Sequence, residues 1–193
     1  MIMSQAPVIA RSVVGELARP ATKQSHNIAG WVCFAALLAL VFVLAFHKVY
    51  NYDIWWHLKT GETIVQTQQI PHTNTFSYTN TDYPWMNVYW LFQVLVYGVH
   101  KVAGFTGLVI MKTLVWLVIG TVLLLATGAH KLTRFWYAGP LWALGFITAS
   151  NRMMVRPEIF TFLFLVVFMV ILWKETRVHT RLIWLLPILQ AVW

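Results

Sequence analysis

Long apolar runs separated by short polar segments are the main pattern along this chain of 193 residues. The runs at 29–46 (AGWVCFAALLALVFVLAF) and 107–126 are each about as long as a helix that crosses a bilayer. Shorter apolar runs follow at 135–149, 159–173 and 182–193. This pattern predicts an all-α, polytopic membrane protein.

Residues 84–103 are also mostly apolar, but polar side chains occur throughout the segment. Asn87, Gln93, Gly98, His100 and Lys101 would be costly facing lipid. The apolar side chains recur every three or four residues at Trp85, Val88, Phe92, Leu95, Val99 and Val102. Such a stripe is typical of an amphipathic helix that lies on the membrane surface. A sixth membrane span is the alternative.

The basic residues favour the amphipathic helix. If 84–103 does not cross, eight basic residues lie inside and five outside, leaving out Lys112, which is inside an apolar run. The inner ones are Arg11, Arg19, Lys23, Lys131, Arg134, Lys174, Arg177 and Arg181, and the outer ones are Lys48, Lys59, Lys101, Arg152 and Arg156. If 84–103 crosses, the count becomes six inside and seven outside. Because basic residues are enriched in cytoplasmic loops, the first topology is preferred.

The predicted architecture is a cytoplasmic leader at 1–28 and a transmembrane domain at 29–193. The domain has four complete spans, a partial fifth and a large outer loop at 48–106 with two amphipathic helices. The spans at 135–149 and 159–173 are short and are expected to extend into flanking residues. The run at 182–193 is too short to cross, so we expect the front part of a longer protein in the cytoplasmic membrane.

Composition agrees with a membrane protein, since 59% of the residues are hydrophobic and only 10% are charged. The net charge of +8 does not indicate nucleic-acid binding, because the basic residues lie in small groups beside apolar runs. Cys33 is the only cysteine, which excludes an intramolecular disulfide and a metal site built from cysteines. There is no HExxH sequence, no glycine-rich phosphate loop and no serine elbow of a hydrolase.

Asp53 is the first candidate for chemistry. It directly precedes a helix expected to run to about Gln66, and it follows the first span closely. An ionised carboxylate there could act as a general base or bind an ion. His57 lies four residues on, on the same helix face, and could hydrogen-bond Asp53. The alternative is that Asp53 only caps the helix.

The second candidate cluster is the segment SNRMMVRPEIF between the third and fourth spans. A helical continuation of the third span would place Arg152 and Arg156 on one face, where they could bind an anionic phosphate. Pro157 is expected in the first turn of the next helix, with Glu158 directly after it. The alternative is that the arginines reach lipid headgroups and Glu158 pairs with one of them.

Other polar and aromatic residues are expected to have structural roles. Lys112, inside an apolar run, is expected to extend to the membrane surface. Lys59 and Glu62 are expected to form a solvated pair one helical turn apart. The aromatic residues of the loop between the two predicted outer helices could stack on a sugar or pack the loop against the bilayer, and they are Phe76, Tyr78, Tyr83 and Trp85.

The order of these parts resembles the membrane-embedded glycosyltransferases of the GT-C fold, which include oligosaccharyltransferases, protein O-mannosyltransferases and lipid A aminoarabinose transferases. The phrases DIWWHLKTGETIV, IPHTNTFSYT, YWLFQVLVYG and MVRPEIFTFLF are similar to those of uncharacterised bacterial multispan proteins of that class. Their usual forms are roughly D-x-W-W-H-L-x-x-G, P-x-x-D-x-F-S-Y-T, E-W-L and R-P-x-x-F. Two positions depart from them, since Asn74 stands where those proteins tend to have Asp and Tyr89 where they tend to have Glu.

The resemblance implies transfer of a sugar from a polyprenyl-phosphate carrier to an acceptor on the outer face of the membrane. Asp53 would be the general base and Glu158 the second acid, while Arg152, Arg156, His57 and Trp56 would bind substrate. Some members of the class hold a divalent cation such as Mg²⁺ or Mn²⁺ between the two acids, so Asp53 and Glu158 are the candidate ligands. The alternatives are a non-catalytic multispan protein or remnant and, less favoured, a transporter.

Overall fold

The computed structural model describes residues 6–74, 76–79, 83–178 and 181–192. In this part of the chain the secondary structure is helical apart from an isolated antiparallel β-bridge between Thr73 and Pro84. The helices are α1 (Ala6–Ala45), α2 (Ile54–Thr67), α3 (Trp90–Thr127), α4 (Leu132–Ala149), α5 (Glu158–Glu175) and α6 (Leu185–Val192), with short 3-10 helices at Ser150–Arg152 and Arg181–Trp184. The prediction of an all-α protein is confirmed for the described residues.

Two helices are long and apolar enough to cross a membrane, namely Ser25–Ala45 within α1 and Trp90–Thr127, which is α3. Helix α1 runs without a break from Ala6 to Ala45, so most of the predicted leader and the first apolar run form one continuous helix. α4 begins before its predicted apolar run, and α5 ends beyond its own.

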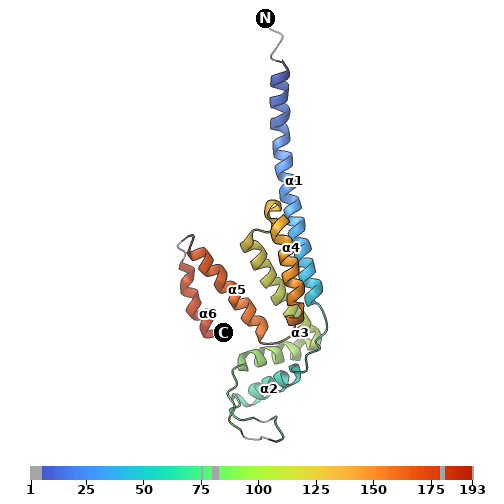
Figure 1. Cartoon of the computed structure of the whole chain (residues 1–193). Helices are drawn as coiled ribbons and strands as arrows, with labels where there is room; N and C mark the ends of the chain where they lie inside the picture. Colours follow the sequence, from blue (N-terminus) through green and yellow to red (C-terminus); the bar gives the residue numbers. More distant parts are fainter. Residues whose placement is uncertain (1–5, 75, 80–82, 179–180, 193) are drawn as a thin grey trace.

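Gly104 divides α3 into two helical parts. Its φ of 60° and ψ of −155° are not helical, and glycine adopts a positive φ without the steric cost that a side chain adds. Figure 1 shows the part before Gly104 beside α2, across the lower end of the upright helices, and the part after it rising among them. A helix before the long apolar segment is therefore present, as predicted.

The start of this loop helix differs from the prediction. α3 begins at Trp90 rather than at residue 84. Its buried residues are Phe92, Gln93 and Val96, whereas Val102 of the predicted stripe is 89% exposed. The reason is that this segment packs against α2, so the position of α2 selects the buried face.

The core has two parts. The upper part joins α1, the second half of α3 and α4, and its buried side chains include Phe34, Leu37, Val41, Trp116, Ile119 and Phe146. The lower part joins α2 to the first half of α3 through Ile54, Leu58, Phe92 and Val96, together with Leu108 and Val155. A Cβ atom on Gly61 of α2 would clash with the carbonyl oxygen of Gln93, so glycine permits the close approach of these two helices.

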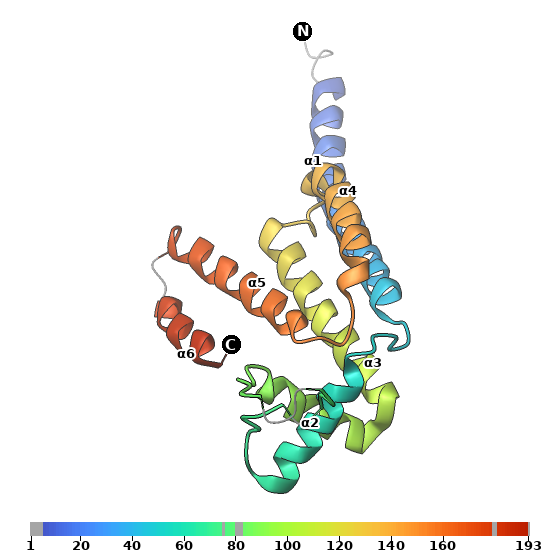
Figure 2. The same ribbon diagram turned by 60° about the horizontal axis from the view of Figure 1, so that its bottom comes forward.

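Figure 2 shows α5 diverging from α3 above this lower layer. The turn between α4 and α5 contacts the start of α2 and the residues just before it, through Arg156 with Asp53 and Val155 with Asn51. The two candidate segments of the sequence meet there.

Candidate functional site

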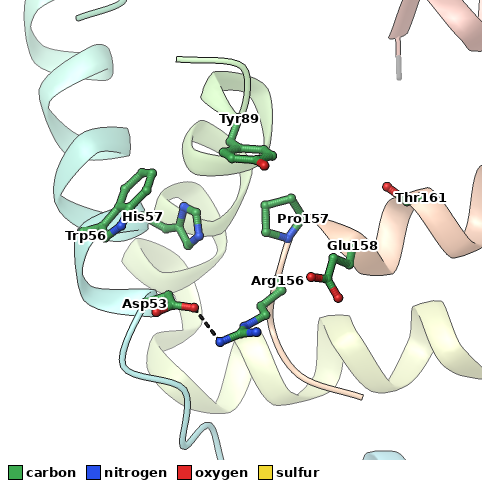
Figure 3. A pocket seen from close by; sticks show the side chains of 8 residues that line it. All are labelled: Asp53, Trp56, His57, Tyr89, Arg156, Pro157, Glu158 and Thr161. Atoms are coloured by element: carbon green, nitrogen blue, oxygen red, sulfur yellow. Dashed lines mark ion pairs between the residues drawn. The ribbon is translucent and has the colours of Figure 1, made fainter. Parts of the chain in front are cut away.

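A cavity of about 360 Å³ lies where the start of α2, the start of α3 and the start of α5 meet. Its lining residues are Asp53, Trp56, His57, Tyr89, Arg156, Pro157, Glu158 and Thr161. Figure 3 shows Asp53 and Arg156 facing each other at one side, with His57, Tyr89 and Pro157 beyond them. The structure therefore brings together both predicted acids and all but one of the predicted substrate-binding residues.

Asp53 and Arg156 form the central ion pair. The Nη2 atom of Arg156 lies 2.6 Å from Oδ2 of Asp53, and the two side chains are 35% and 48% exposed. Asp53 stands at the position before α2, as predicted, but its side chain makes no capping hydrogen bond. The interpretation of Asp53 as a helix cap is thus wrong, because its carboxylate pairs with the guanidinium instead.

Arg152 does not line the cavity that Arg156 lines. α4 ends at Ala149, and the chain continues through the short 3-10 helix Ser150–Arg152 and an irregular turn. The prediction that one helical face presents both arginines is therefore wrong. Arg152 instead pairs with Glu158, with Nη1 and Oε2 3.6 Å apart. α5 begins at Glu158, directly after Pro157, close to the predicted start.

Two side chains with no predicted role in the site, Asn51 and Lys112, hold the turn that carries Arg156. Asn51 donates a hydrogen bond from Nδ2 to the carbonyl oxygen of Val155 at 3.1 Å. Lys112 donates from Nζ to the carbonyl oxygen of Met153 at 3.2 Å. Both bonds are buried, and their acceptors, Val155 and Met153, lie one and three residues before Arg156. They therefore fix the position of the backbone from which the Arg156 side chain extends.

Lys112 is fully buried, with no exposed surface, so the prediction that it extends to the membrane surface is wrong. Its Nζ atom lies 3.0 Å from Nδ1 and 3.2 Å from Nε2 of His47, which follows α1. The sequence marks Lys112 only as a basic residue inside an apolar run. The partners are distant in the chain, and the helical pattern does not identify them.

His57 is only 4% exposed. Burial lowers its pKa from 6.5 to about 4, since the charged imidazolium is poorly solvated there; the Asp53 carboxylate opposes this shift and the Arg156 guanidinium adds to it. His57 is therefore neutral near pH 7. Its buried Nδ1 atom has no hydrogen-bond partner in the described part of the chain. The predicted hydrogen bond to Asp53 is not formed.

The two acids do not fit a divalent cation. Each already faces an arginine, Asp53 through Arg156 and Glu158 through Arg152, and a guanidinium beside a carboxylate repels a metal ion. Among the described residues, no three His, Cys, Asp or Glu side chains lie close enough together to hold a metal. The cation that the resemblance implied therefore has no suitable ligand set here.

A second, smaller cavity of about 200 Å³ adjoins the first and shares Trp56 with it. Its other lining residues are Asn74, Phe76 and Trp85. The Trp56 and Trp85 rings lie 5.6 Å apart in an edge-to-face arrangement. Of the two positions that depart from the resemblance, Asn74 lines this cavity and Tyr89 lines the larger one. The pair Lys59 and Glu62 is formed as predicted, at 2.8 Å and outside both cavities.

Comparisons with models of known protein families, with curated proteins and with solved structures find no match to this chain. The resemblance to GT-C glycosyltransferases therefore stays a prediction from the sequence phrases.

Proposed function

We propose that this chain is a membrane glycosyltransferase of the GT-C type, which transfers a sugar from a polyprenyl-phosphate carrier to an acceptor hydroxyl on the outer face of the cytoplasmic membrane. One observation carries the proposal: the carboxylate of Asp53 and the guanidinium of Arg156 meet in a cavity beside long apolar helices. A base and a phosphate-binding cation are the two groups that this reaction needs most. The apolar helices suit a donor with an isoprenoid tail.

In the proposed step, the acceptor oxygen attacks the anomeric carbon of the sugar. The bond from that carbon to the carrier phosphate breaks, and its electron pair leaves with the polyprenyl phosphate. The proton of the acceptor hydroxyl passes to the carboxylate of Asp53. Because the phosphate is already a good leaving group, one general base is sufficient, unlike glycoside hydrolysis with its two carboxylates.

Arg156 stabilises the charge that develops on the leaving phosphate. Its guanidinium has five N–H donors, and the contact with Asp53 is made through Nη2. The donors that Asp53 leaves open at the cavity are available to a phosphate. Arg152, more exposed and in a looser pair with Glu158, adds positive charge nearby. Asn51 and Lys112 keep the turn in place while the phosphate enters and leaves.

The proposed topology has four spans, formed by α1, the part of α3 after Gly104, α4 and α5, with α6 as the beginning of a fifth. α4 and α5 have 18 residues each, which corresponds to a length of about 27 Å. That is close to the bilayer core of about 30 Å. α2 and residues 90–103 then lie at the outer surface, where the cavity opens.

A second candidate is a non-catalytic membrane protein in which the Asp53–Arg156 pair only holds α2 against α5. The observation in its favour is that the carboxylate is already paired, so it needs no ligand. The cavity argues against it, since both side chains remain partly exposed rather than packed.

The two candidates are separated by transfer of label from polyprenyl-phosphate-glucose and polyprenyl-phosphate-mannose in membranes. Asp53→Asn keeps the shape of the side chain but removes its charge and basicity. We expect it to lower transfer by about a hundredfold or more, the usual contribution of a general base. Glu62→Gln is the matched control, because Glu62 is an acid of the same helix outside both cavities. If Asp53→Asn transfers sugar at the rate of the wild type, Asp53 is not the general base and the Asp53–Arg156 pair has only a structural role.

A further inference from the structure

We infer that the smaller cavity, lined by Trp56, Asn74, Phe76 and Trp85, is a subsite that binds a neutral sugar ring. The assignment of that ring to a transfer reaction rests on the proposed function. The binding itself requires only the cavity. Its position supports the inference, because Trp56 is a wall of both cavities and places the subsite next to Asp53 and Arg156.

The walls of this cavity are held by specific contacts. Trp56 comes from α2, while Asn74 and Trp85 come from two facing limbs of the loop between α2 and α3. The limbs are joined by backbone hydrogen bonds from Asn74 to Tyr83 at 2.9 Å and from Trp85 to His72 at 2.8 Å. The cavity is therefore bounded by a hydrogen-bonded loop together with α2, and not by one exposed helix alone.

Asn74 fixes the position of Phe76. Its Oδ1 atom accepts hydrogen bonds from the backbone N–H groups of Phe76 and Ser77, at 3.1 and 3.2 Å. The amide nitrogen of Asn74 makes no hydrogen bond to another described residue, so its two N–H donors are available to a ligand. Phe76 remains 47% exposed, which shows that the loop does not bury it.

The chemistry of the walls favours a sugar over a charged ligand. None of the four lining side chains carries a charge, whereas the larger cavity has two acids and an arginine. Aromatic faces carry partial negative charge and attract the C–H groups on one side of a pyranose ring. The amide donors of Asn74 would bind its hydroxyl oxygens. An aspartate at position 74 would supply only acceptors and add a negative charge beside the phosphate site.

The volume also indicates a single ring. Pockets for drug-sized ligands are roughly 300–1,000 Å³, and this cavity is smaller at about 200 Å³. The edge-to-face packing of Trp56 and Trp85 gives two indole planes at 79° to one another. A ring that is not flat, with apolar and polar faces, suits such a corner better than a planar base.

The test measures binding of methyl glucoside and methyl mannoside by saturation-transfer NMR to the purified full chain, in a detergent without a sugar headgroup. The Asp53→Asn background prevents turnover. We expect Trp85→Ala to weaken binding about tenfold and Trp85→Phe to retain much of it, because a phenyl ring keeps an aromatic face. Tyr78→Ala is the matched control, since Tyr78 belongs to the same loop, is 98% exposed and lines neither cavity.

Each outcome decides the inference. No binding by the Asp53→Asn protein, or equal binding by Trp85→Ala and its parent, overturns the subsite. An equal loss in Tyr78→Ala also overturns it, because the effect then belongs to the loop as a whole. Binding that depends on Trp85 without any transfer by the wild type leaves the subsite standing and refutes the proposed function. If transfer occurs, a rise in the KM of donor or acceptor for Trp85→Ala identifies which sugar occupies the cavity.

Discussion

Two polar clusters fasten the turn between α4 and α5, and they differ in access to solvent. In the Asp53 cluster, the Asp53 and Arg156 side chains are about half and one third exposed and border a cavity. In the Lys112 cluster, Lys112 is fully buried and bonds to His47 and to the backbone of Met153. One cluster leaves its charged groups open to a ligand, and the other uses its charged group for internal contacts.

This difference indicates how a mostly apolar chain can position a partly exposed ion pair. A buried donor that satisfies a backbone carbonyl fixes the chain locally, because an unpaired carbonyl in an apolar interior is costly. The Arg156 side chain can then reach Asp53 from a backbone whose position is fixed. We therefore expect the Lys112 cluster to govern stability and the Asp53 cluster to govern activity.

The largest effect on stability is expected for Lys112→Met, which keeps an unbranched side chain but removes the donor. The carbonyl of Met153 and the ring of His47 then lose their buried partner, and each such loss costs about 1–3 kcal/mol. Thermal unfolding in detergent should show a clear fall in midpoint. Lys101→Met on the exposed part of α3 is the control, and an equal fall there would contradict the separate role of Lys112.

A smaller effect, on donor binding alone, is expected for Arg156→Lys. Lysine keeps the charge but loses the planar arrangement of donors, so the affinity for a short-chain polyprenyl-phosphate-glucose should fall about tenfold. Arg152→Lys should change it less, because Arg152 is 64% exposed and its pair with Glu158 is looser. Unchanged affinity in both variants would show that the donor phosphate does not bind at Arg156 and Arg152.

A further effect is a pH dependence from His57. Its pKa is about 4 in the folded protein against 6.5 ordinarily, so between these values the unfolded chain binds a proton that the folded protein does not. Stability should therefore fall as pH decreases from about 6.5 to about 4, with no contribution above that range. Unfolding midpoints at pH 7 and pH 5 should differ less for His57→Gln than for the wild type, whereas exposed His72→Gln should keep the full difference.

The sequence predicts the parts of this structure that depend on local pattern. The apolar runs predicted the helices, and Asp53 correctly marked the start of α2, because helix periodicity and helix starts are local properties. The Lys59–Glu62 pair was predicted for the same reason. The sequence motifs around Asp53 and Arg156 also identified two segments that the fold brings together.

Contacts between distant segments could not be predicted in this way. Nothing in the pattern around Lys112 indicates that His47, 65 residues away, lies beside it. Which side of residues 90–103 is buried within the protein depends on where α2 packs, and a local pattern does not show that. The helical interpretation of Arg152 and Arg156 failed because α4 ends at Ala149, before a turn whose shape depends on Asn51 and Lys112.

The most direct test of the central claim, that the Asp53–Arg156 pair is chemical rather than only structural, is an exchange of the two residues. Asp53→Arg and Arg156→Asp are measured singly and together, by thermal unfolding and by transfer of labelled sugar from polyprenyl-phosphate-glucose and polyprenyl-phosphate-mannose. Each single variant places like charges together and should lose both stability and transfer. The double variant restores the pairing of opposite charges, so we expect its stability to recover while transfer stays absent, because the base now extends from the turn before α5. Transfer by the double variant at the rate of the wild type, or none by the wild type itself, would contradict the account.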